Sequence, residues 1–286
     1  MQLEMSLNLL RCSVKADEVL FWGKVMGVVN DYFLAVTVTF AGQYEFPQKR
    51  FYYTLSNTPD FAFKELPELG LPEPEQDMLI DNTASLFEGN PDKVLSGKAE
   101  GEDGEEEPPA EEAPEDEDEE GEKKAKDSDE SEEEEIKVPK RILTELDRLA
   151  TVVLAIENDC QICPVGAFKM SAQHELKRAA AFAGLRGAEA CKMENYQHFR
   201  NVQTEQKKRD LDLPEAPFTR DFLEPISADL PKGCWNLQAS ERSDTVLIRS
   251  LNWPGYQFFH KCGSAKFGGL YIGDGLKNQE VHFIVQ

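Results

Sequence analysis

A chain of 286 residues with a formal charge of −23 has room for one large domain or two ordinary ones. Its acidic balance argues against direct binding of DNA or RNA, because attraction to phosphate requires a basic face. No apolar run approaches the ~20 residues that a membrane helix requires, so we expect neither a nucleic-acid partner nor a membrane span.

Most of the negative charge lies in one segment. From Glu100 to Glu135 there are 22 Asp or Glu against three Lys, a net charge of −19, and no Val, Ile, Leu, Met, Phe, Trp or Tyr. Such a segment cannot bury enough apolar surface to offset the entropy of ordering it. We predict a disordered acidic insertion over residues 93–136, within a single domain made of residues 1–92 and 137–286. Its charge is compatible with binding of basic partners or with a merely solvated insert.

The first strong signal for strands lies near the start of the chain. From Glu18 to Phe40, two runs rich in β-branched and aromatic residues flank Asn30-Asp31, whose side chains tolerate the backbone of a tight turn. This pattern predicts an antiparallel hairpin. The run from Arg50 to Asn57 predicts a third strand. The prolines that follow it favour a loop, because proline donates no hydrogen bond to a neighbouring strand.

Helical patterns follow the acidic segment. Apolar residues recur every three or four positions between Arg141 and Ile156, which is the spacing of a helix with one buried side. The alanine-rich stretch from His174 to Ala190 predicts a second, shorter helix, broken at Gly184 or Gly187. The polar stretch from Asn201 to Asp221 is interpreted as a long surface connection.

The last part of the chain returns to strand patterns. Between Lys232 and Gly275, turn residues separate KGCWNLQA, DTVLIRSLNW, YQFFH and GGLYIGDG, which are each typical of a strand. Strands at both ends of the chain with helices between them predict an α+β fold. We expect one antiparallel sheet built from the N- and C-terminal strands, with helices from the middle of the chain.

Six cysteines are scattered through a chain whose start lacks the features of a secretory signal, so we expect reduced thiols and an intracellular protein. Cys160 and Cys163 have the spacing of half a zinc site or of a redox pair. A tetrahedral zinc site needs four Cys or His ligands in paired spacings, and the second pair is missing. We interpret both as buried or idle thiols and predict no metal site.

The sequence offers little for catalysis. None of the four histidines lies beside a nucleophile motif or a second histidine at helical spacing. The glycines of Gly273-Asp274-Gly275 could cradle an anion, but Asp274 would repel phosphate, so a turn at a strand end is the preferred interpretation. We predict no catalytic residue and no cofactor. A hydrolase or oxidoreductase would need a cleft lined by groups with shifted pKa values.

Two strand-like stretches carry a further signal: VLFWGKVMGVVNDYFLA, residues 19–35, and LPKGCWNLQASERSDTVLIRSLNWPGYQFFH, residues 230–260, which is followed by FGGLYIGDGLKN. The first resembles the FWG-containing hairpin of the radial spoke head protein family of the ciliary axoneme. The second is similar to the later strands of that family. The chain stops soon after YIGDGLKN, unlike the 4/6 type of the family. The helical region that precedes the FWG strand in family members is largely absent, so we expect little helix there.

The resemblance implies a non-enzymatic structural subunit of the radial spoke head, which scaffolds head assembly and passes signals between the central pair and the dynein arms. It implies other head subunits as partners, the 4/6 type first among them, in a homo- or hetero-oligomer with indirect contact to the central pair. It places the protein in the cytoplasm, the cytoskeleton and the axoneme of a cilium or flagellum. An acidic chaperone for basic partners is the alternative. The candidate structural or interface residues are Trp22, Gly23, Tyr32, Lys232, Gly233, Trp235, Arg249, Trp253, Pro254, Gly255, Tyr271 and Gly273.

The stretch Trp253-Pro254-Gly255 is interpreted as a corner between two strands. Pro254 fixes φ and removes an N–H, and Gly255 allows the backbone to reverse. Trp253 then anchors the corner by burying a large ring, whose indole N–H still needs a partner. The alternative is an exposed Trp253 that binds another protein.

Overall fold

The computed structural model describes residues 2–40, 46–69, 79–80, 86–96, 143–171, 176–211, 213, 221–240, 242 and 244–284. Most of the predicted acidic insertion, residues 97–136, lies outside these ranges. Its predicted start at residue 93 is contradicted, because Val94–Ser96 form strand β5, which pairs with β6 (Leu143–Thr144). The two described chain ends that flank the acidic segment therefore lie side by side.

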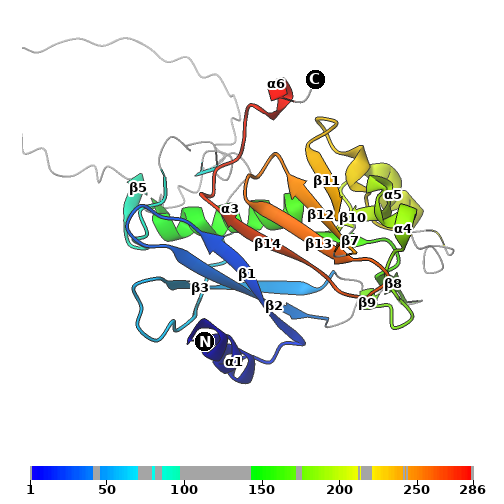
Figure 1. Ribbon diagram of the computed structural model, residues 1–286. Coiled ribbons are helices and arrows are strands. Elements are labelled where there is room, and N and C mark those ends of the chain that lie inside the picture. The colour runs from blue at the N-terminus through cyan, green and yellow to red at the C-terminus, as the bar shows by residue number, and fades with distance from the viewer. Residues whose placement is uncertain are drawn as a thin grey trace, which may run out of the picture.

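One eight-stranded sheet forms the centre of the molecule (Figure 1). Four strands from the start of the chain lie beside four from its end, as the sequence predicted. Neighbouring strands are antiparallel except β1 and β14, whose parallel pairing at the middle of the sheet was not expected. In sheet order the strands are β11 (Trp235–Ser240), β12 (Thr245–Ser250), β13 (Tyr256–Lys261), β14 (Phe267–Gly273), β1 (Glu18–Val25), β2 (Tyr32–Thr39), β3 (Gln48–Leu55) and β4 (Lys64–Glu65).

The predicted hairpin at the start of the chain is confirmed as β1 and β2, and the predicted third strand as β3. Side chains alternate between the two faces of each strand, because successive residues of a strand point in opposite directions. In β13, Tyr256, Phe258 and His260 are buried, whereas the residues between them are exposed. This alternation gives the sheet one strongly apolar face.

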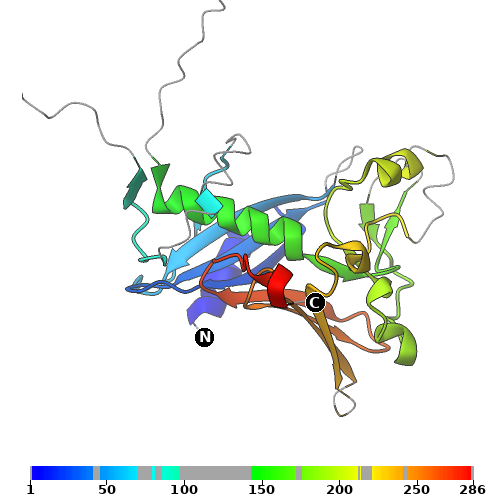
Figure 2. The same ribbon diagram turned by 90° about the horizontal axis from the view of Figure 1, so that it is seen from above.

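Two helices cover opposite faces of the sheet (Figures 1 and 2). Helix α3 (Glu145–Cys160) crosses the apolar face and buries Leu149, Val152, Val153 and Ile156 completely. Thr144 caps its start, because its hydroxyl accepts the N–H of Asp147 while the Asp147 carboxylate accepts the N–H of Thr144. The predicted helix is thus confirmed, with its start shifted from Arg141 to Glu145.

Helix α1 (Gln2–Ser13) covers the other face of the N-terminal strands and was not expected. Its Leu10 packs with Val19, Ala35 and Tyr52, which point away from α3. Twelve helical residues therefore precede the FWG strand, contrary to the expectation of little helix there.

The predicted helix from His174 to Ala190 is largely wrong. Leu176–Arg178 form strand β9, which pairs with β8 (Phe168–Met170), and only Gly187–Ala190 are helical, as α4. Residues 172–175 lie outside the described residues. At Gly184 φ is +89° and the backbone of Ser264 passes close by, so tertiary contacts override the helix propensity of the alanines.

The elements not yet described all follow α3 in the sequence. The predicted surface connection from Asn201 to Asp221 contains a short helix, so that interpretation was incomplete. None of the described helices has the length and apolar character to cross a membrane; the longest, α3, has 16 residues. The remaining elements are β7 (Ile162–Pro164), η1 (Met193–Asn195), β10 (Tyr196–His198), α5 (Glu205–Leu211), η3 (Ile226–Ala228) and α6 (Val281–Ile284).

Candidate functional site

The three tryptophans of the chain share one arrangement. Each is buried, and each donates its indole N–H to a carboxylate. Trp22 donates to Glu157 at 2.7 Å, Trp235 to Asp229 at 2.8 Å and Trp253 to Asp159 at 2.9 Å. Buried indoles need such a partner, and bonds to an ionised acceptor are the stronger kind. We call these contacts the tryptophan–carboxylate pairs.

Glu157 also binds a cation. Lys49 on β3 places its Nζ 2.6 Å from Glu157 Oε1 and 4.8 Å from the centre of the Phe199 ring. Both side chains of this ion pair are largely buried, with 13% and 7% of their surface exposed. A buried carboxylate is tolerated when its charge and its lone pairs are both satisfied, and Trp22 and Lys49 together meet that requirement.

The first residue of α3 makes a comparable contact. The hydroxyl of Tyr32, on β2, donates to Glu145 Oε1 at 2.7 Å. The same carboxylate accepts the backbone N–H groups of Glu88, Gly89 and Asn90 at 3.1, 2.7 and 3.0 Å. Burial, followed by the hydrogen bond to Glu145, raises the pKa of Tyr32, so the phenol remains a donor. Glu145 thereby fixes the start of α3 to β2 and to the segment 88–90.

Three glycines of the predicted motifs meet at β14. A methyl group on Gly23 would strike the carbonyl of Tyr271, and one on Gly255, where φ is +102°, would strike the carbonyl of Ile272. Gly273 lies against the carbonyl of Pro254 in the same way. The FWG, WPG and YIGDG stretches are therefore parts of one junction, where close approach of the backbones excludes side chains.

Trp253 lies in the core, at the corner between β12 and β13. Its exposed surface is zero, the N–H of Tyr256 donates to its carbonyl at 3.1 Å, and Lys277 Nζ lies 5.7 Å from its ring centre. Pro254, the next residue, is exposed. This buried placement is the one that the corner interpretation requires. It contradicts the alternative of an exposed Trp253.

The structure does not bring all twelve candidate residues together. Trp22, Gly23, Trp253, Pro254, Gly255, Tyr271 and Gly273 lie at or next to the β14 junction, and the Trp22 and Tyr271 ring centres are 5.6 Å apart. Tyr32 and Trp235 are buried elsewhere in the core. The other three candidates, Lys232, Gly233 and Arg249, are exposed on the surface and lie outside the core.

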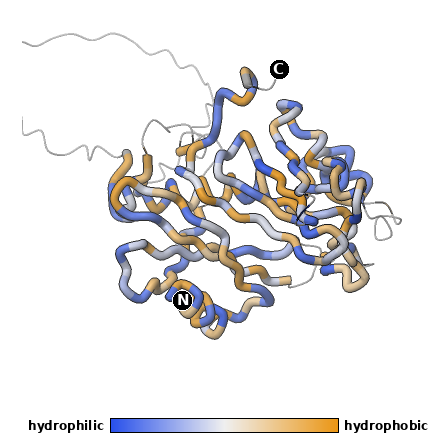
Figure 3. Tube along the Cα trace, in the orientation of Figure 1, coloured by the Kyte–Doolittle hydropathy of each residue, from blue (hydrophilic) through white to orange (hydrophobic). Residues whose placement is uncertain are grey.

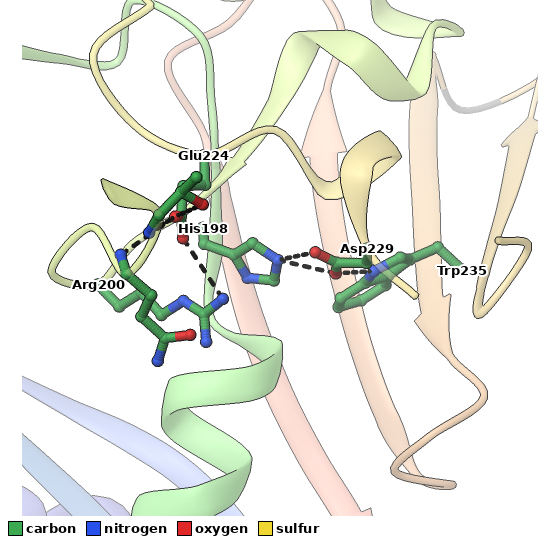
Figure 4. Close-up of polar contacts among 7 residues, drawn as sticks. His198, Arg200, Glu224, Asp229 and Trp235 are labelled. Carbon is green, nitrogen blue, oxygen red and sulfur yellow. Dashed lines mark hydrogen bonds and ion pairs between the residues drawn. The ribbon is translucent and has the colours of Figure 1, made fainter. Parts of the chain in front are cut away.

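A second polar network lies beyond the end of α3, and sequence reasoning missed it. Figure 4 shows His198 and Trp235 reaching the Asp229 carboxylate from two sides. His198 Nε2 lies 2.9 and 2.8 Å from the two Asp229 oxygens. These residues are 31 and 6 positions from Asp229 and form no recognisable motif, so no signal in the sequence could have grouped them.

Arg200 and Glu224 extend this network (Figure 4). Arg200 Nη2 lies 3.5 Å from Glu224 Oε2, and Glu224 Oε1 accepts the N–H groups of Gln203 and Thr204 at 3.1 and 2.7 Å. Burial alone would raise the pKa of Glu224, but the hydrogen bonds from Thr204 and Gln203 and the charge of Arg200 outweigh it and lower the pKa. The network fastens the segment around residue 224 to β10.

Cys160 ends α3 and Cys163 lies in β7, and both are buried. Burial raises the pKa of Cys163 to about 12 and also raises that of Cys160. Thiols of this kind stay protonated at neutral pH, and the thiolate is the form that attacks or binds metal. Within the described ranges, no group of three or more His, Cys, Asp and Glu is placed to hold a metal ion.

The carboxylates of these networks are all held by donors from the protein. Glu145, Glu157, Asp159 and Asp229 each accept hydrogen bonds from a tyrosine or tryptophan. Glu145, Glu157 and Asp159 join α3 to the sheet, and Asp229 joins β10 to β11. The site is best described as a structural framework.

Comparison with known proteins decides the family. No family model matches the chain. The radial spoke head protein 9 homolog of Danio rerio is 31% identical over 286 residues, which cover 99% of this chain and 90% of that protein. The chain belongs to the radial spoke head protein 9 family. Relatives with the same name from Bos taurus and Homo sapiens are each 28% identical over 280 residues, 98% of this chain and 89% of theirs. The family resemblance of residues 19–35 and 230–278 thus extends over nearly the whole chain.

Proposed function

We propose that this protein is a non-enzymatic structural subunit of the radial spoke head in the axoneme of cilia or flagella. The observation that carries the proposal is the match to a radial spoke head protein 9 homolog over 99% of the chain. In this role the protein scaffolds the head and passes signals between the central pair and the dynein arms.

The framework around α3 supports a mechanical role. Glu145 binds Tyr32 on β2, Glu157 binds Trp22 on β1 and Lys49 on β3, and Asp159 binds Trp253 at the β12–β13 corner. One helix is therefore tied by charged hydrogen bonds to strands from both ends of the chain. A subunit that transmits force benefits from this arrangement, because the two groups of strands cannot slide past each other without breaking buried polar contacts.

The proposed partners are other radial spoke head subunits, the 4/6 type in particular, in a homo- or hetero-oligomer that contacts the central pair indirectly. A stable interface of this kind buries roughly 1,200–2,000 Å². Exposed residues within the family-like stretches, such as Lys232 and Arg249, are candidates for contact.

Localisation tests the proposal directly. Antibodies against the protein should label axonemes, and the label should disappear in mutants that lack the spoke head. The protein should also co-purify with the 4/6-type subunit from salt extracts of axonemes. Uniform cytoplasmic labelling that is unchanged in spoke-head mutants would contradict the proposal.

An acidic chaperone for basic proteins is a second candidate, and the charge of −19 between Glu100 and Glu135 favours it. Its test is deletion of that run. The chaperone would be favoured if the deletion abolished binding to a purified core histone and if the undeleted protein did not label axonemes.

A further inference from the structure

The side of the sheet that faces away from α3 is covered by a described helix over only part of its width. Helix α1 packs there on the N-terminal strands, through Leu10 against Val19, Ala35 and Tyr52. Figure 1 looks onto this side, with α3 behind the sheet and α1 at its N-terminal strands. We call the outward side of β12, β13 and β14 the open face; its apolar or charged side chains are Leu247, Arg249, Phe259, Lys261, Leu270 and Ile272.

Four of these side chains form a continuous apolar patch. Phe259 and Ile272 have 43% and 48% of their surface exposed, and Leu247 and Leu270 are half-buried. Leu247 lies opposite Phe259, and Phe259 lies opposite Gly268. A methyl group on Gly268 would lie 3.2 Å from the Phe259 ring, so the ring covers this glycine. Figure 3, in the same orientation, shows hydrophobic colour on these strands.

The fold does not require apolar side chains on this side of β12–β14. An antiparallel sheet with one solvated face normally alternates apolar residues inward with polar residues outward. The outward residues of the neighbouring strand β11 follow that rule, since they are Asn236, Gln238 and Ser240. On the N-terminal strands, α1 covers the outward apolar residues. Contiguous exposed apolar side chains, such as those of the open face, mark contact surfaces.

A cavity adjoins the open face, between β1 and β14. These strands pair over Gly23–Val25 and leave the first residues of β1 unpaired with β14. The cavity has a volume of about 300 Å³. Phe259 and Gly268 line it from the open face, and Trp22 and Glu157 line it from the side of α3. It therefore leads from the open face into the sheet.

The charges inside this cavity are already balanced. Its charged lining residues form two ion pairs, Lys49 with Glu157 and Arg178 with Glu18, each with a distance of 2.6 Å. A further charge would have no partner there, so the cavity suits an uncharged apolar side chain. Buried apolar anchors in pockets of this kind dominate the binding energy of many protein interfaces.

The charges of the open face indicate the chemistry of the partner. Arg249 and Lys261 are exposed and point to the same side as Phe259. None of the outward residues of β11–β14 is Asp or Glu, and among the described residues of the β11–β12 turn Arg242 and Asp244 balance each other. Charges more than ~8 Å away are largely screened at physiological ionic strength. The two cations therefore make the open face complementary to an acidic surface.

We propose that the open face binds a protein surface whose apolar side chains are flanked by Asp and Glu, and that one of those apolar side chains enters the cavity between β1 and β14. A second copy of the chain fits less well, because two open faces carry charge of the same sign. The inference rests on the proposed role as an assembled subunit and adds the chemistry of the partner, which is testable without the spoke head.

The first experiment tests the apolar patch in the full-length protein with two peptides of equal charge, a Leu–Glu peptide and an oligoglutamate. The parent protein should bind the Leu–Glu peptide at least about tenfold more tightly, because only that peptide buries apolar surface. In the variant Phe259→Thr, Ile272→Thr this preference should disappear, while threonine keeps the strand propensity. The control is Leu154→Ala on α3, on the opposite side of the sheet and 38% exposed, which should keep the preference.

The variant Arg249→Glu, Lys261→Glu tests the charge. It should bind the Leu–Glu peptide at least about tenfold more weakly than the parent, because attraction becomes repulsion, and a Leu–Lys peptide no more weakly. Lys192→Glu, Arg209→Glu is the matched control: both residues are exposed and lie outside the open face, and the net charge changes equally. It should bind the Leu–Glu peptide as the parent does. Because Arg249 and Lys261 are exposed, this arm decides the inference even if the threonine variant melts at a lower temperature.

Several outcomes would overturn the inference. These are equal binding of the Leu–Glu peptide and the oligoglutamate by the parent, a preference that survives in the threonine variant, and a loss in the charge control as large as in the charge variant. A dimer of the parent that the threonine variant does not form would assign the open face to a second copy. Binding to phosphatidylserine vesicles that the charge variant loses, without binding to the Leu–Glu peptide, would assign it to a membrane surface.

A second experiment separates this inference from the proposed function. The same variants are expressed in ciliated cells that lack their own copy, and the protein retained on isolated axonemes is quantified. Absence of the parent protein from axonemes would contradict the proposed function, while the peptide results still decide the inference. Full retention of the threonine and charge variants alongside the parent would contradict the open face as a spoke-head contact and leave the proposed function standing.

Discussion

The indole N–H of Trp22, on β1, donates a 2.7 Å hydrogen bond to the carboxylate of Glu157, on α3. The acidic segment separates the two residues in the sequence, and the same carboxylate holds Lys49 of β3 at 2.6 Å. One side chain therefore joins the helix to two strands of the N-terminal group. Because all three groups are largely buried, the contact sets how α3 sits on the sheet.

Replacing Trp22 by phenylalanine tests this contact. Phenylalanine keeps an aromatic ring in the core but removes the N–H, and we expect a loss of about 1.5–3 kcal/mol in the free energy of unfolding, as for hydrogen bonds to charged groups. Urea unfolding measures the loss. Trp235→Phe is the matched control, and its loss should be smaller, because its acceptor Asp229 is 23% exposed and keeps its contact with His198. A Trp22→Phe protein as stable as the parent would show that the bond contributes nothing net.

Replacing Trp253 by alanine should cost about 3–5 kcal/mol, as for other large core aromatics. That is a large share of the ~5–15 kcal/mol that stabilises a domain, so spoke-head assembly should fail because the subunit itself unfolds or is degraded. Thermal unfolding and the amount of soluble protein measure the effect. A variant that keeps its melting temperature yet cannot join the head would mean that Trp253 acts as a partner anchor, a role that can carry ~2 kcal/mol or more.

Local patterns predicted the strands and the main helix, because their causes lie within a few residues. The apolar spacing from Arg141 to Ile156 and the alternation in β13 are visible in the sequence, and both elements form. The error between His174 and Ala190 has the opposite cause. Alanine favours a helix, but Leu176–Arg178 pair with β8 instead, and propensity is a weak signal against such pairing.

The contacts that join distant segments were not predictable. Trp22 and Glu157 are 135 positions apart, Tyr32 and Glu145 are 113 apart, and neither pair has a spacing that a motif could reveal. The glycines of the motifs could be read from the sequence, but the reason why glycine is required there could not. Gly23 and Gly255 are required because the backbone of β14 passes against both. For Gly23 this depends on the parallel pairing of β1 with β14, which the sequence does not indicate.

Gly255→Ala tests that close approach. The added methyl group would strike the carbonyl of Ile272, and φ at this position is +102°, so we expect a loss of more than ~2 kcal/mol from strain and displacement of β14. Gly187→Ala is the control, because φ there is +47° and nothing lies within 4 Å of the added atom. Its cost should be about 1 kcal/mol. Denaturant unfolding compares the two, and equal losses would mean that the contact with β14 is not the cause.

His260 should make stability depend on pH. The ring is fully buried and its Nε2 accepts the N–H of Leu185 at 3.1 Å. Burial lowers the pKa of His260 below its usual 6.5, against weaker opposing effects of the backbone of Lys266 and Leu185. The unfolded chain therefore takes up a proton near pH 6.5 before the folded protein does, and stability present above that pH is lost as the pH falls through it.

Thermal unfolding between pH 7.5 and pH 5 measures this loss. We expect a smaller fall of the melting temperature in His260→Gln, whose side-chain oxygen can accept the same N–H without taking up a proton. The range stays above pH 5 because the lowered pKa of Glu224 contributes its own dependence below its usual value of 4.5. The same fall in the parent and in His260→Gln would assign the pH dependence to another group.

The sequence before Asn90 and the sequence after Lys137 should unfold as one cooperative unit. β1 lies between β2 and β14 in the sheet, and α3 buries its apolar side against strands from both ends of the chain. Either part alone would expose its side of that core and the free edge of β1 or β14. We therefore expect one transition for the full chain by calorimetry and by tryptophan fluorescence, with coincident midpoints.

Residues 1–92 and 137–286 expressed separately should each lack a cooperative transition, and co-expression of the two should restore a single one. Two independent transitions in the full chain, each reproduced by one of the separate parts, would show that the shared sheet does not couple them.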